Sequence, residues 1–404
     1  MGQLHLKRIK GKNKVPTLMK SLFMVSSLRT LPHFLPRCIS RCQKRRKTTF
    51  SQAIDNFANK NQIYVSTSLD PYLNLSIEHH LFEKTARDSV ILFIYTNRSS
   101  IIIGRNQNPW NEINLNLVRK SSPSIQIVRR RSGGGTVFHD EGNVNYCVIS
   151  PASSFDRDKH AYMVVQALKS AGVEKVGIND RHDIVLEHID NDGFDKPFKI
   201  SGSAYKLTKF RSLHHGTCLL SSPNLGAISQ YLNSPAKIFI TARGVASVSS
   251  RIKNVCISNI TFQKAVIKQF CQIYSAAHPI FVGDEMKEES NIAKGYAELK
   301  SNNWIYCQTP QFTFSLDGNS RFPTDPEKTF RDVWKSPLSF HEEFTARNGC
   351  ITSASSSLTY FLNKNIHEIQ DWSFPSYLES QDSTNAYRAK LGRFLNSLFG
   401  KSGD

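Results

Sequence analysis

The sequence lacks aspartate and glutamate throughout its first 54 residues, although 13 lysines and arginines lie there. An acid-free basic segment with scattered leucine, phenylalanine and serine is typical of a mitochondrial transit peptide. A disordered basic tail is the alternative, as is a nuclear signal at Lys44–Lys47. We therefore predict that residues 1–54 are a targeting or disordered leader, and that the protein works in the mitochondrial matrix.

The rest of the chain has little excess charge of either sign. The net charge of the whole sequence is +19, and because 13 positive charges belong to the leader, the other 350 residues carry only about +6. A nucleic-acid-binding protein needs basic residues clustered on its folded part, with aromatic side chains between them. Nucleic acid is therefore not an expected partner, and a basic nucleic-acid-binding protein is a distant alternative.

Long hydrophobic runs and cysteine motifs are also missing. The longest apolar runs, such as Val90–Tyr95, are far shorter than the ~20 residues of a membrane helix, so we expect no membrane partner. The eight cysteines form no C-x-x-C pair and no histidine–cysteine set with zinc spacing. This usage predicts a reducing compartment and no metal site of that kind.

What is present is a mixture of short strands and helices. Runs of β-branched and aromatic residues predict strands, and apolar residues at helical spacing predict helices. The predicted strands are Ser89–Tyr95, Ser100–Gly104, Ile125–Arg130, Thr136–His139, Asn143–Ile149, Asp183–Leu186, Phe198–Ser201 and Thr217–Leu220. The predicted helices are Asn74–Lys84, Asp156–Ala171 with Gly172 after its end, Pro223–Leu232, and Thr261–Ala277 capped by Ser258 or Asn259. Since the βαβ alternation is not regular, we predict an α+β fold.

A polar, acid-rich stretch, Gly283–Ile292, separates this body from a shorter C-terminal part. There, Phe344–Thr352 predicts a hairpin with Asn348-Gly349 as its turn. Thr384–Leu398 predicts a last amphipathic helix. We therefore predict a mixed-sheet catalytic domain flanked by helices at residues 55–290, and a small α/β accessory domain at residues 291–404.

Three arginines run directly into three glycines at Arg129–Asp140, R-R-R-S-G-G-G-T-V-F-H-D. A P-loop needs a Lys-Ser/Thr pair after its glycines, and a dinucleotide fingerprint opens a helix. Neither fits, because a strand-like Thr-Val-Phe-His follows. A strand–loop–strand whose N–H groups form an anion nest is left, and a tight turn with solvated arginines is the alternative. We expect Arg130 at the ligand, with Arg129 and Arg131 on the other strand face.

A second polar feature is the predicted strand that contains Lys199. Alternation directs Lys199 and Ser201 to one face, among small residues that leave room for a ligand. A lysine there is a point charge for a carboxylate or phosphate, and a solvated surface lysine is the alternative. We expect His214 and His215 to form structural hydrogen bonds. Cys218 is expected in the core, because a reactive thiol needs an accessible, electropositive setting.

These segments, in this order, resemble the lipoate–protein ligase A family of the biotin/lipoate protein ligase superfamily. The matching segments are Ile102–Trp110, Arg129–Asp140 with Gly142-Asn143, Arg181–Asp183, Lys199–Tyr205, His214–Thr217 and, more weakly, Arg243–Asn254. The resemblance covers residues 65–280, and the motifs are specific because they follow one another at compatible spacing. Together with the leader, it implies a eukaryotic, fungal-type mitochondrial member.

The resemblance implies an enzyme that uses ATP and Mg²⁺ to convert lipoate or octanoate to an acyl-adenylate. It then passes the acyl group to one lysine of a lipoyl domain. The implied partners are the apo lipoyl domains of 2-oxoacid dehydrogenase complexes and the glycine cleavage H protein, and no prosthetic group is implied. Lys199 is the implied catalytic residue, in contact with the carboxylate and the α-phosphate. The implied substrate- and ATP-binding residues are Arg130, Ser132, Gly133, Gly134, Gly135, Thr136, Val137, Phe138, His139, Asp183, Ser201, Gly202, Ala204 and Gly216. Asp183 either holds the magnesium ion or caps its strand.

Two departures from the family leave the acyl donor open. The ligase motif commonly has Arg-Asn-Asp where this chain has Arg181-His182-Asp183, and the C-terminal part is shortened. The alternative is an ATP-independent transferase that takes its acyl group from acyl-CoA, an acyl carrier or another lipoyl protein. A biotin–protein ligase is disfavoured because its G-R-G-R-x-G-R loop and K-W-P-N-D strand are absent. A non-catalytic lipoyl-domain binder is disfavoured because Lys199, Arg130 and the loop glycines are all present.

Overall fold

The computed structural model describes residues 50–54, 58–187, 197–276, 278–317, 341–375 and 383–400. Residues 1–49 of the predicted leader lie outside this set. Its last residues, Phe50–Ile54, form helix α1. Phe50, Ala53 and Ile54 are buried, and the Phe50 ring lies edge-on against Tyr64. The packed part of the chain therefore includes the end of the segment that the sequence assigns to the leader.

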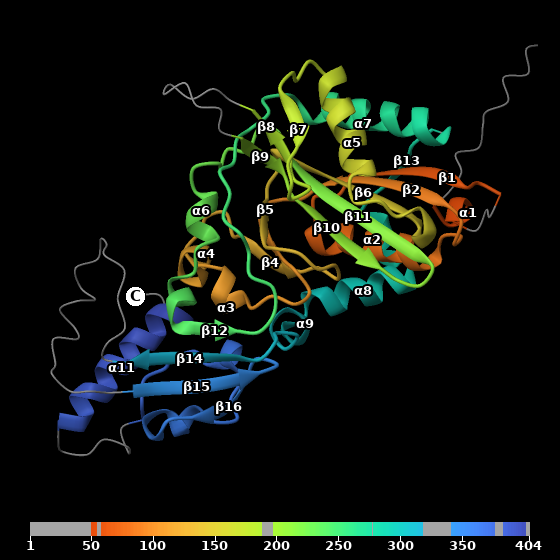
Figure 1. Cartoon of the computed structure of the whole chain (residues 1–404). Coiled ribbons are helices and arrows are strands. Elements are labelled where there is room, and N and C mark those ends of the chain that lie inside the picture. Colours follow the sequence, from red (N-terminus) through yellow and green to blue (C-terminus); the bar gives the residue numbers. More distant parts are fainter. Residues whose placement is uncertain are drawn as a thin grey trace, which may run out of the picture. The chain divides into compact units, whose positions relative to one another are not determined.

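A six-stranded mixed sheet positions the rest of the fold, in the order β10-β11-β6-β2-β1-β13 (Figure 1). Strand β1 is parallel to β2 and β13, and the other neighbours are antiparallel. The strands are β1 (Asn61–Ser66), β2 (Val90–Thr96), β6 (Asn143–Pro151), β10 (Ser203–Leu207), β11 (Arg211–Leu219) and β13 (Ile280–Val282).

Both faces of this sheet are buried, which explains why its central strands are almost continuously apolar. Ile91, Phe93 and Tyr95 of β2 belong to one hydrophobic cluster, whereas Leu92 and Ile94 belong to another. Successive side chains of a strand point to opposite faces. Helices α2 (Pro71–Lys84) and α8 (Ser290–Lys300) cover the first face, and α5 (Lys159–Ser170) and α7 (Asn259–Tyr274) cover the second (Figure 1).

Local signals explain where these helices begin and end. Helix α2 starts three residues before the prediction, because the Asp70 carboxylate accepts the N–H groups of Tyr72 and Leu73 and proline occupies the first turn. The predicted Ser258 cap of α7 is confirmed. Gly172 follows α5 with φ +88°, as predicted. The predicted helix Pro223–Leu232 is wrong in extent: only α6 (Ile228–Tyr231) is helical, because proline and glycine precede it.

Two three-stranded sheets flank the main one and carry the polar segments. In the first, β3 pairs with β4 in parallel and with β5 in antiparallel orientation. In the second, β8 pairs with β7 and β9, both antiparallel. Their strands are β3 (Ser100–Ile103), β4 (Gln126–Arg129), β5 (Val137–His139), β7 (Val176–Ile178), β8 (Ile184–Leu186) and β9 (Phe198–Ser201).

A four-stranded antiparallel sheet joins both sides of the predicted boundary at residue 290. Its order is β12-β14-β15-β16, so that β12 from the catalytic part pairs with a strand of the C-terminal part. The turn at Asn348-Gly349 is confirmed, with φ values of +53° and +76°. The strands are β12 (Ile240–Ala242), β14 (Phe312–Asp317), β15 (His341–Arg347) and β16 (Cys350–Ala354).

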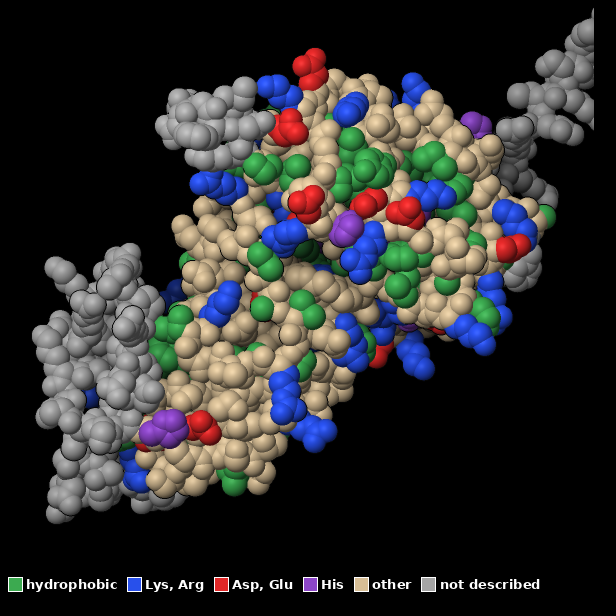
Figure 2. All heavy atoms as spheres, in the orientation of Figure 1, with side chains coloured by type: hydrophobic (Ala, Val, Ile, Leu, Met, Phe, Trp, Pro, Cys, Tyr) green, Lys and Arg blue, Asp and Glu red, His purple; other side chains and the backbone are tan. Residues whose placement is uncertain are grey.

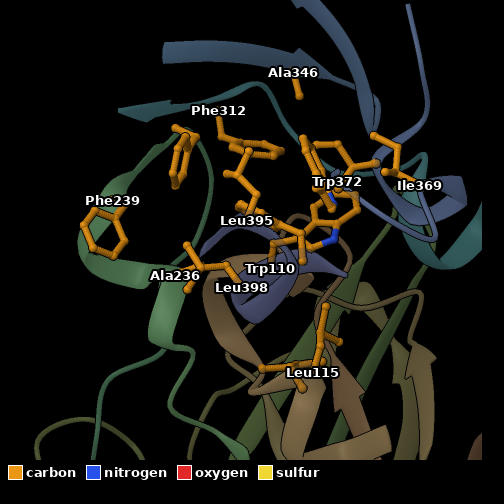
Figure 3. Close-up of a cluster of buried hydrophobic side chains, with 14 of the residues drawn as sticks. Trp110, Leu115, Ala236, Phe239, Phe312, Ala346, Ile369, Trp372, Leu395 and Leu398 are labelled. Carbon is orange, nitrogen blue, oxygen red and sulfur yellow. The ribbon is translucent and has the colours of Figure 1, made fainter. Parts of the chain in front are cut away.

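One hydrophobic cluster is also built from both sides of that boundary. Figure 3 shows Trp110 and Leu115 together with Phe312, Trp372 and Leu395. The division into domains at residue 290 stays a prediction, but the two parts share this core. The remaining helices are α3 (Pro109–Glu112), α4 (Leu115–Arg119), α9 (Asn302–Tyr306) and α11 (Ser383–Phe399), and short 3₁₀ helices lie at Ala152–Ser154, Pro235–Phe239, Asp284–Glu288, Ser356–Phe361 and Ile366–Glu368.

The predicted α+β class, a mixed sheet flanked by helices with a smaller α/β C-terminal part, is therefore confirmed. Within the residues that the structure describes, no helix combines the length and apolar character needed to cross a bilayer.

Candidate active site

Two adjoining cavities, of about 300 Å³ and about 380 Å³, lie beside β5 and β9. The first cavity is walled by Leu75, Tyr95 and Ile102, together with charged and polar side chains. The second contains Phe138, Ile228 and Leu232. The residues that line both cavities are Thr136, Val137, Lys199, Gly202, Thr217, Ser247 and Val248. The two cavities thus share a wall, and Lys199 is the ionisable residue in it.

Most of the predicted site residues lie in these walls. The first cavity is lined by Arg130, Gly135, Thr136, Val137, His139, Asp183, Lys199, Gly202, Ala204 and Gly216. Phe138 and Ser201 line the second cavity. Ser132, Gly133 and Gly134 line neither of them. The structure therefore brings residues from four separate segments together, and it places three members of the glycine segment behind the wall.

Lys199 is held at the shared wall by an ion pair and by its backbone. Its Nζ lies 2.8 Å from Oδ1 of Asp183, whose side chain is 9% exposed. Its backbone N–H donates to the carbonyl of Arg251. Gly202 leaves room for the lysine side chain, because an added Cβ there would lie 3.3 Å from Nζ. The arrangement presents one ammonium group, a quarter exposed, to both cavities.

Arg130 lines the first cavity, but it donates most of its hydrogen bonds to the glycine segment. Nη2 donates to the carbonyls of Gly133 (2.5 Å) and Gly135 (2.7 Å), and Nη1 donates to that of Ile102 (3.1 Å). Nε donates to Oγ of Ser132 (3.1 Å). Burial lowers the pKa of Arg130 to about 10, so the group stays protonated at neutral pH. Its first role is therefore to hold the loop.

The glycine loop passes close to neighbouring backbone. Gly134 has φ +86°, and an added Cβ would lie 2.9 Å from Nη2 of Arg130. At Gly104 an added Cβ would lie 2.1 Å from the carbonyl oxygen of Gly134. Within the described part of the chain, no protein acceptor takes the N–H groups of Gly133, Gly134 or Gly135. With the carbonyls of Gly133 and Gly135 bound by Arg130, the N–H group of Gly135, which lines the first cavity, is the donor left for an anion.

His139 is a neutral side chain in the wall of the first cavity. Its Nδ1 lies 2.9 Å from Nδ2 of Asn97, so it accepts that hydrogen, and Nε2 therefore carries the proton. Burial, together with the charges of Arg130 and His215, lowers the pKa of His139 to about 3. At neutral pH the imidazole is thus an uncharged donor.

The neighbouring histidines of β11 point to opposite faces of the strand. Nε2 of His214 bonds to Oγ of Ser203, and His215 lies in the first cavity. Structural hydrogen bonds were expected for both, and both make them. Cys218 is fully buried in the core as predicted, and burial raises the pKa of its thiol.

Sequence reasoning missed the residues that hold the loop between β12 and α7 against the glycine segment. Oε1 of Gln107 accepts from the Gly104 N–H and from Oγ1 of Thr136. Its Nε2 donates to Oγ of Ser247, which also accepts the N–H of Thr136. A lone glutamine and serine carry no periodic signal. The one sign of them was that they fall in segments of the family resemblance.

Arg129 and Arg131 face away from the cavities, toward residues 298–309. Arg129 is fully buried and donates to the carbonyls of Gly104, Arg105, Gln107 and Ile305 and to Oγ1 of Thr309. Arg131 pairs with Glu298, and its guanidinium lies 4.6 Å from the ring centre of Trp304. Neither side chain lines either of the two cavities, whereas Arg130 lines the first.

The surface charges are dispersed on the face that Figure 2 shows. Lys and Arg side chains are spread over it, with Asp and Glu side chains between several of them. Nucleic-acid binding relies on a continuous basic patch or stripe. This face does not offer one among the residues that are described.

Comparisons with known proteins agree with the geometry. Residues 70–277, more than half of the chain, match the family described as "Lipoyl protein ligase A/B catalytic domain". A curated Schizosaccharomyces pombe protein named "Putative lipoate-protein ligase A" is 36% identical over 292 residues, which span 67% of this chain and 77% of that protein.

One solved structure shows a similar fold, and a second is reported beside it. The crystal structure of P. falciparum LipL1 in complex with lipoate matches with a TM-score of 0.51 and 23% identity, over 83% of this chain and 99% of that one. A bipartite lipoate protein ligase with its E2 lipoyl domain from Thermoplasma acidophilum matches with a TM-score of 0.48 and 21% identity, over 61% of this chain and 96% of that one.

Proposed function

Because this chain belongs to the lipoyl protein ligase A/B catalytic-domain family, we propose that it attaches lipoyl or octanoyl groups to the acceptor lysine of lipoyl domains. The proposed reaction has two steps. An acyl-adenylate forms from the free acid and ATP, and the acyl group then passes to the lysine. One observation carries the proposal: Lys199 stands in the wall shared by two cavities, paired with one buried carboxylate.

The two cavities differ in the chemistry of their walls. Leu75, Tyr95 and Ile102 give the first cavity an apolar part that suits an acyl chain. The ring of Phe138 and the side chains of Ile228 and Leu232 give the second a slot for a flat base. Its polar lining suits a ribose and phosphates, and consists of Asn143, Ser229, Asn233 and Lys237. We assign the first cavity to the acyl group and the second to the nucleotide.

Adenylation brings two anions together, and Lys199 supplies the cation where they meet. As the carboxylate attacks the α-phosphate, negative charge accumulates between the two cavities. A fixed ammonium group there stabilises the transition state more than the separate substrates. Lys199 must exchange Asp183 for the substrate anions, and the absence of a side chain at Gly202 gives it space to move.

Asp183 is the residue that would hold a magnesium ion. Magnesium is usually bound by one or two carboxylates and by substrate phosphates. Asp183 lines the first cavity beside the shared wall, and no cluster of three or more metal-ligating side chains exists in the described residues, so the phosphates would complete the coordination. When bound, the ion neutralises charge on the phosphates.

The same groups serve the transfer step. When the acceptor amine attacks, the acyl carbonyl oxygen becomes an oxyanion, and Lys199 and the unpaired N–H group of Gly135, which lines the first cavity, are the donors at hand. The implied acceptors are the lipoyl domains of 2-oxoacid dehydrogenase complexes and the H protein of glycine cleavage.

The departure from the family motif at His182 leaves the arrangement of Asp183 intact. His182 adopts a left-handed conformation, φ +62°, which asparagine tolerates better than most residues. Its Nδ1 lies 2.7 Å from Oδ1 of Asp158, which holds the turn. Asp183 still pairs with Lys199. The substitution is therefore no argument against ATP use, and transfer without ATP becomes an outcome of the test below.

The test is a transfer assay with an apo lipoyl domain and, separately, an apo H protein. The donors are ATP with lipoate, ATP with octanoate, octanoyl-CoA, and an octanoylated H protein. We expect a mass gain on the acceptor with ATP and free acid, together with pyrophosphate release. Transfer from octanoyl-CoA or from the acylated protein alone would assign the ATP-independent reaction. No mass gain with any donor would contradict the proposal.

We also propose that the protein works in the mitochondrial matrix, on the strength of its acid-free basic leader. Fusion of residues 1–54 to a fluorescent protein tests this. Fluorescence that follows the mitochondrial potential supports the proposal, and diffuse or nuclear fluorescence contradicts it.

A further inference from the structure

A continuous chain of buried polar side chains runs from Glu78 on α2 to Arg130 beside the first cavity. The Glu78 carboxylate oxygens lie 3.0 and 3.1 Å from Nδ1 of His215. Nε2 of His215 lies 2.7 Å from Oγ of Ser132. Oγ of Ser132 lies 3.1 Å from Nε of Arg130. All four side chains are buried, with residue exposures between 4% and 7%. We call these residues the Glu78–Arg130 chain.

With a neutral His215 imidazole, the donors and acceptors of the Glu78–Arg130 chain can be assigned in one way only. The Nε–H of Arg130 can only donate, so Oγ of Ser132 accepts it. The hydroxyl hydrogen of Ser132 then goes to Nε2 of His215, which must be unprotonated. Nδ1 of His215 therefore carries the hydrogen and donates to Glu78. The Tyr95 hydroxyl donates to the same carboxylate at 3.2 Å and helps to hold it in place.

Arg130, at one end of the Glu78–Arg130 chain, holds the glycine loop in place. Arg130 binds the carbonyls of Gly133 and Gly135, and Gly135 lines the first cavity. If Arg130 turned away, these carbonyls would lose their donors, and the loop N–H groups would lose their fixed direction. Electrostatic catalysis depends on donors that are oriented before the reaction starts.

We propose that Glu78 and His215 are positioning residues, which act through Ser132 to hold the Arg130 guanidinium and, with it, the glycine loop. Neither Glu78 nor its link to the loop follows from the sequence motifs. The negative charge of Glu78 also offsets the positive charge of Arg130 in the protein interior. For its kinetic test the inference rests on the proposed acyl transfer; its spectroscopic test does not.

The order serine–histidine–carboxylate is also that of a nucleophilic triad. Two observations favour positioning instead. Oγ of Ser132 already accepts a hydrogen from Arg130, and Ser132 lines neither of the two cavities. An acyl group on Ser132, detected as a mass gain of the enzyme that Ser132→Ala abolishes, would overturn the assignment.

The kinetic test uses Ser132→Ala, Glu78→Gln and the double variant in the full chain. Partners behind a site typically change activity by about 10–100-fold. We expect each single variant to lower kcat by about that factor, with KM for ATP and for the acid unchanged. Because both substitutions interrupt the same series of hydrogen bonds, the Glu78–Arg130 chain, the double variant should be no slower than the slower single variant. Multiplied losses in the double variant would overturn the proposal.

Ser212→Ala is the matched control. Ser212 is a buried serine on β11, the strand of His215, and its Oγ lies 2.9 Å from Oγ of Ser150. It lines neither cavity. We expect its kcat to equal that of the unmodified protein. A loss equal to that of Ser132→Ala would show that any buried hydroxyl of this sheet has the same effect, and would overturn the positioning role.

NMR of the histidine ring nitrogens tests the hydrogen bonds of the Glu78–Arg130 chain without any substrate. The His215 signals are assigned by their loss in His215→Gln. We expect an Nδ1–H tautomer with a hydrogen-bonded Nε2, and a shift of the Nε2 resonance in Ser132→Ala. An Nε2–H tautomer would overturn the proposal even if the enzyme is active. If the tautomer is as expected but no donor gives transfer, the proposed function fails and the positioning of the loop stands.

Discussion

Arg129 and Arg130 are neighbours in the chain, yet they belong to two regions with different chemistry. Arg129 faces away from the cavities, where five neutral oxygens from residues 104–107 and 305–309 surround its guanidinium and no carboxylate is bound to it. Arg130 faces the first cavity and is connected to the carboxylate of Glu78 through a serine and a histidine. One arginine joins parts of the fold, and the other orients a site.

The comparison shows that a positive charge in a binding motif is not in itself a binding group. Both side chains are almost fully buried, and burial lowers the pKa of both. What separates them is the position of their acceptors. Two acceptors of Arg129 belong to the C-terminal part, at Ile305 and Thr309, and connect it to β4. Most acceptors of Arg130 belong instead to the glycine loop. The predictions below separate the two roles by stability and by activity.

The largest effect is expected on stability, from Arg129→Leu. The change leaves several buried carbonyls and the Thr309 hydroxyl without a donor, which we expect to cost about 3–5 kcal/mol of unfolding free energy. Urea denaturation measures it. Arg131→Ala is the control, because a partly exposed ion pair and one cation–π contact contribute about 1 kcal/mol or less. Equal losses in both variants would contradict the distinction.

Lys199→Ala should lower the activity and leave the stability almost unchanged, in contrast to Arg129→Leu. Removing one donor to a developing charge typically costs about 3 kcal/mol of transition-state stabilisation, roughly 100-fold in kcat. Since the side chain is partly exposed and its main partner is Asp183, we expect the melting temperature to change little. Mass spectrometry of the acceptor measures the transfer rate. Lys199→Ala, Asp183→Asn tests whether an unpaired Asp183 causes any part of the loss. A folded Lys199→Ala protein with full activity would refute the assignment.

Gly134→Ala tests whether the loop geometry is required. The residue has φ +86°, and the added methyl group would meet the Arg130 guanidinium at 2.9 Å. We expect a loss of about 1–3 kcal/mol in stability and a lower kcat. Gly133→Ala is the matched control, since an added Cβ there has no neighbour within 4 Å. If Gly133→Ala lowered kcat as much as Gly134→Ala, the close contact with Arg130 would not be the cause.

The smallest change in the free energy of unfolding per residue is expected when the pH is lowered. Burial lowers the pKa of His79 and His139 to about 3 and that of His160 to about 4, whereas the usual value is 6.5. The unfolded chain therefore binds more protons than the folded one below pH 6.5. Stability is complete above pH 6.5 and falls as the pH drops toward 4, by up to about 1.4 kcal/mol per pH unit for each histidine.

Urea denaturation at pH 7, 6 and 5 measures this slope. His160→Gln should make the slope shallower, because its side chain no longer titrates; His160 lies on α5, away from both cavities. An unchanged slope would show that His160 is protonated in the folded protein. His139→Gln should change the slope by a similar amount and should also affect the acyl cavity.

The sequence predicted those parts of the fold whose signals are local. Strand β9 has the predicted bounds, because alternating residues and glycine mark its ends. Strand β1 was missed, since its pairing with β2 and β13 joins distant segments in parallel. Helix α2 could have been predicted in full from the Asp70-Pro71 pair. Strand β12 was missed because three residues form too short a pattern.

The candidate site shows the same limit. The glycine segment and Lys199 were identified from charge beside small residues; Lys199 lies where the two cavities meet, as do Thr136 and Val137, which directly follow the glycines. Glu78 was not identified, although in the folded protein only the His215 side chain connects it to Ser132. The reason is that His215 lies 137 positions further along the sequence than Glu78. Local patterns do not encode which distant side chains meet. The role of Arg129 was likewise visible only through residues 305 and 309.

The shared core has a consequence for synthesis. Leu391, Leu395 and Leu398 on α11 pack in the same cluster as Trp110 and Leu115 (Figure 3). Helix α11 follows Trp110 in the chain by more than 250 residues, so the apolar surface around Trp110 cannot be covered until α11 has been synthesised. Large exposed apolar surfaces on unfinished chains promote aggregation. A nonsense mutation that ends the chain just before α11, although it leaves every cavity residue in place, should therefore yield a chain that aggregates or is degraded.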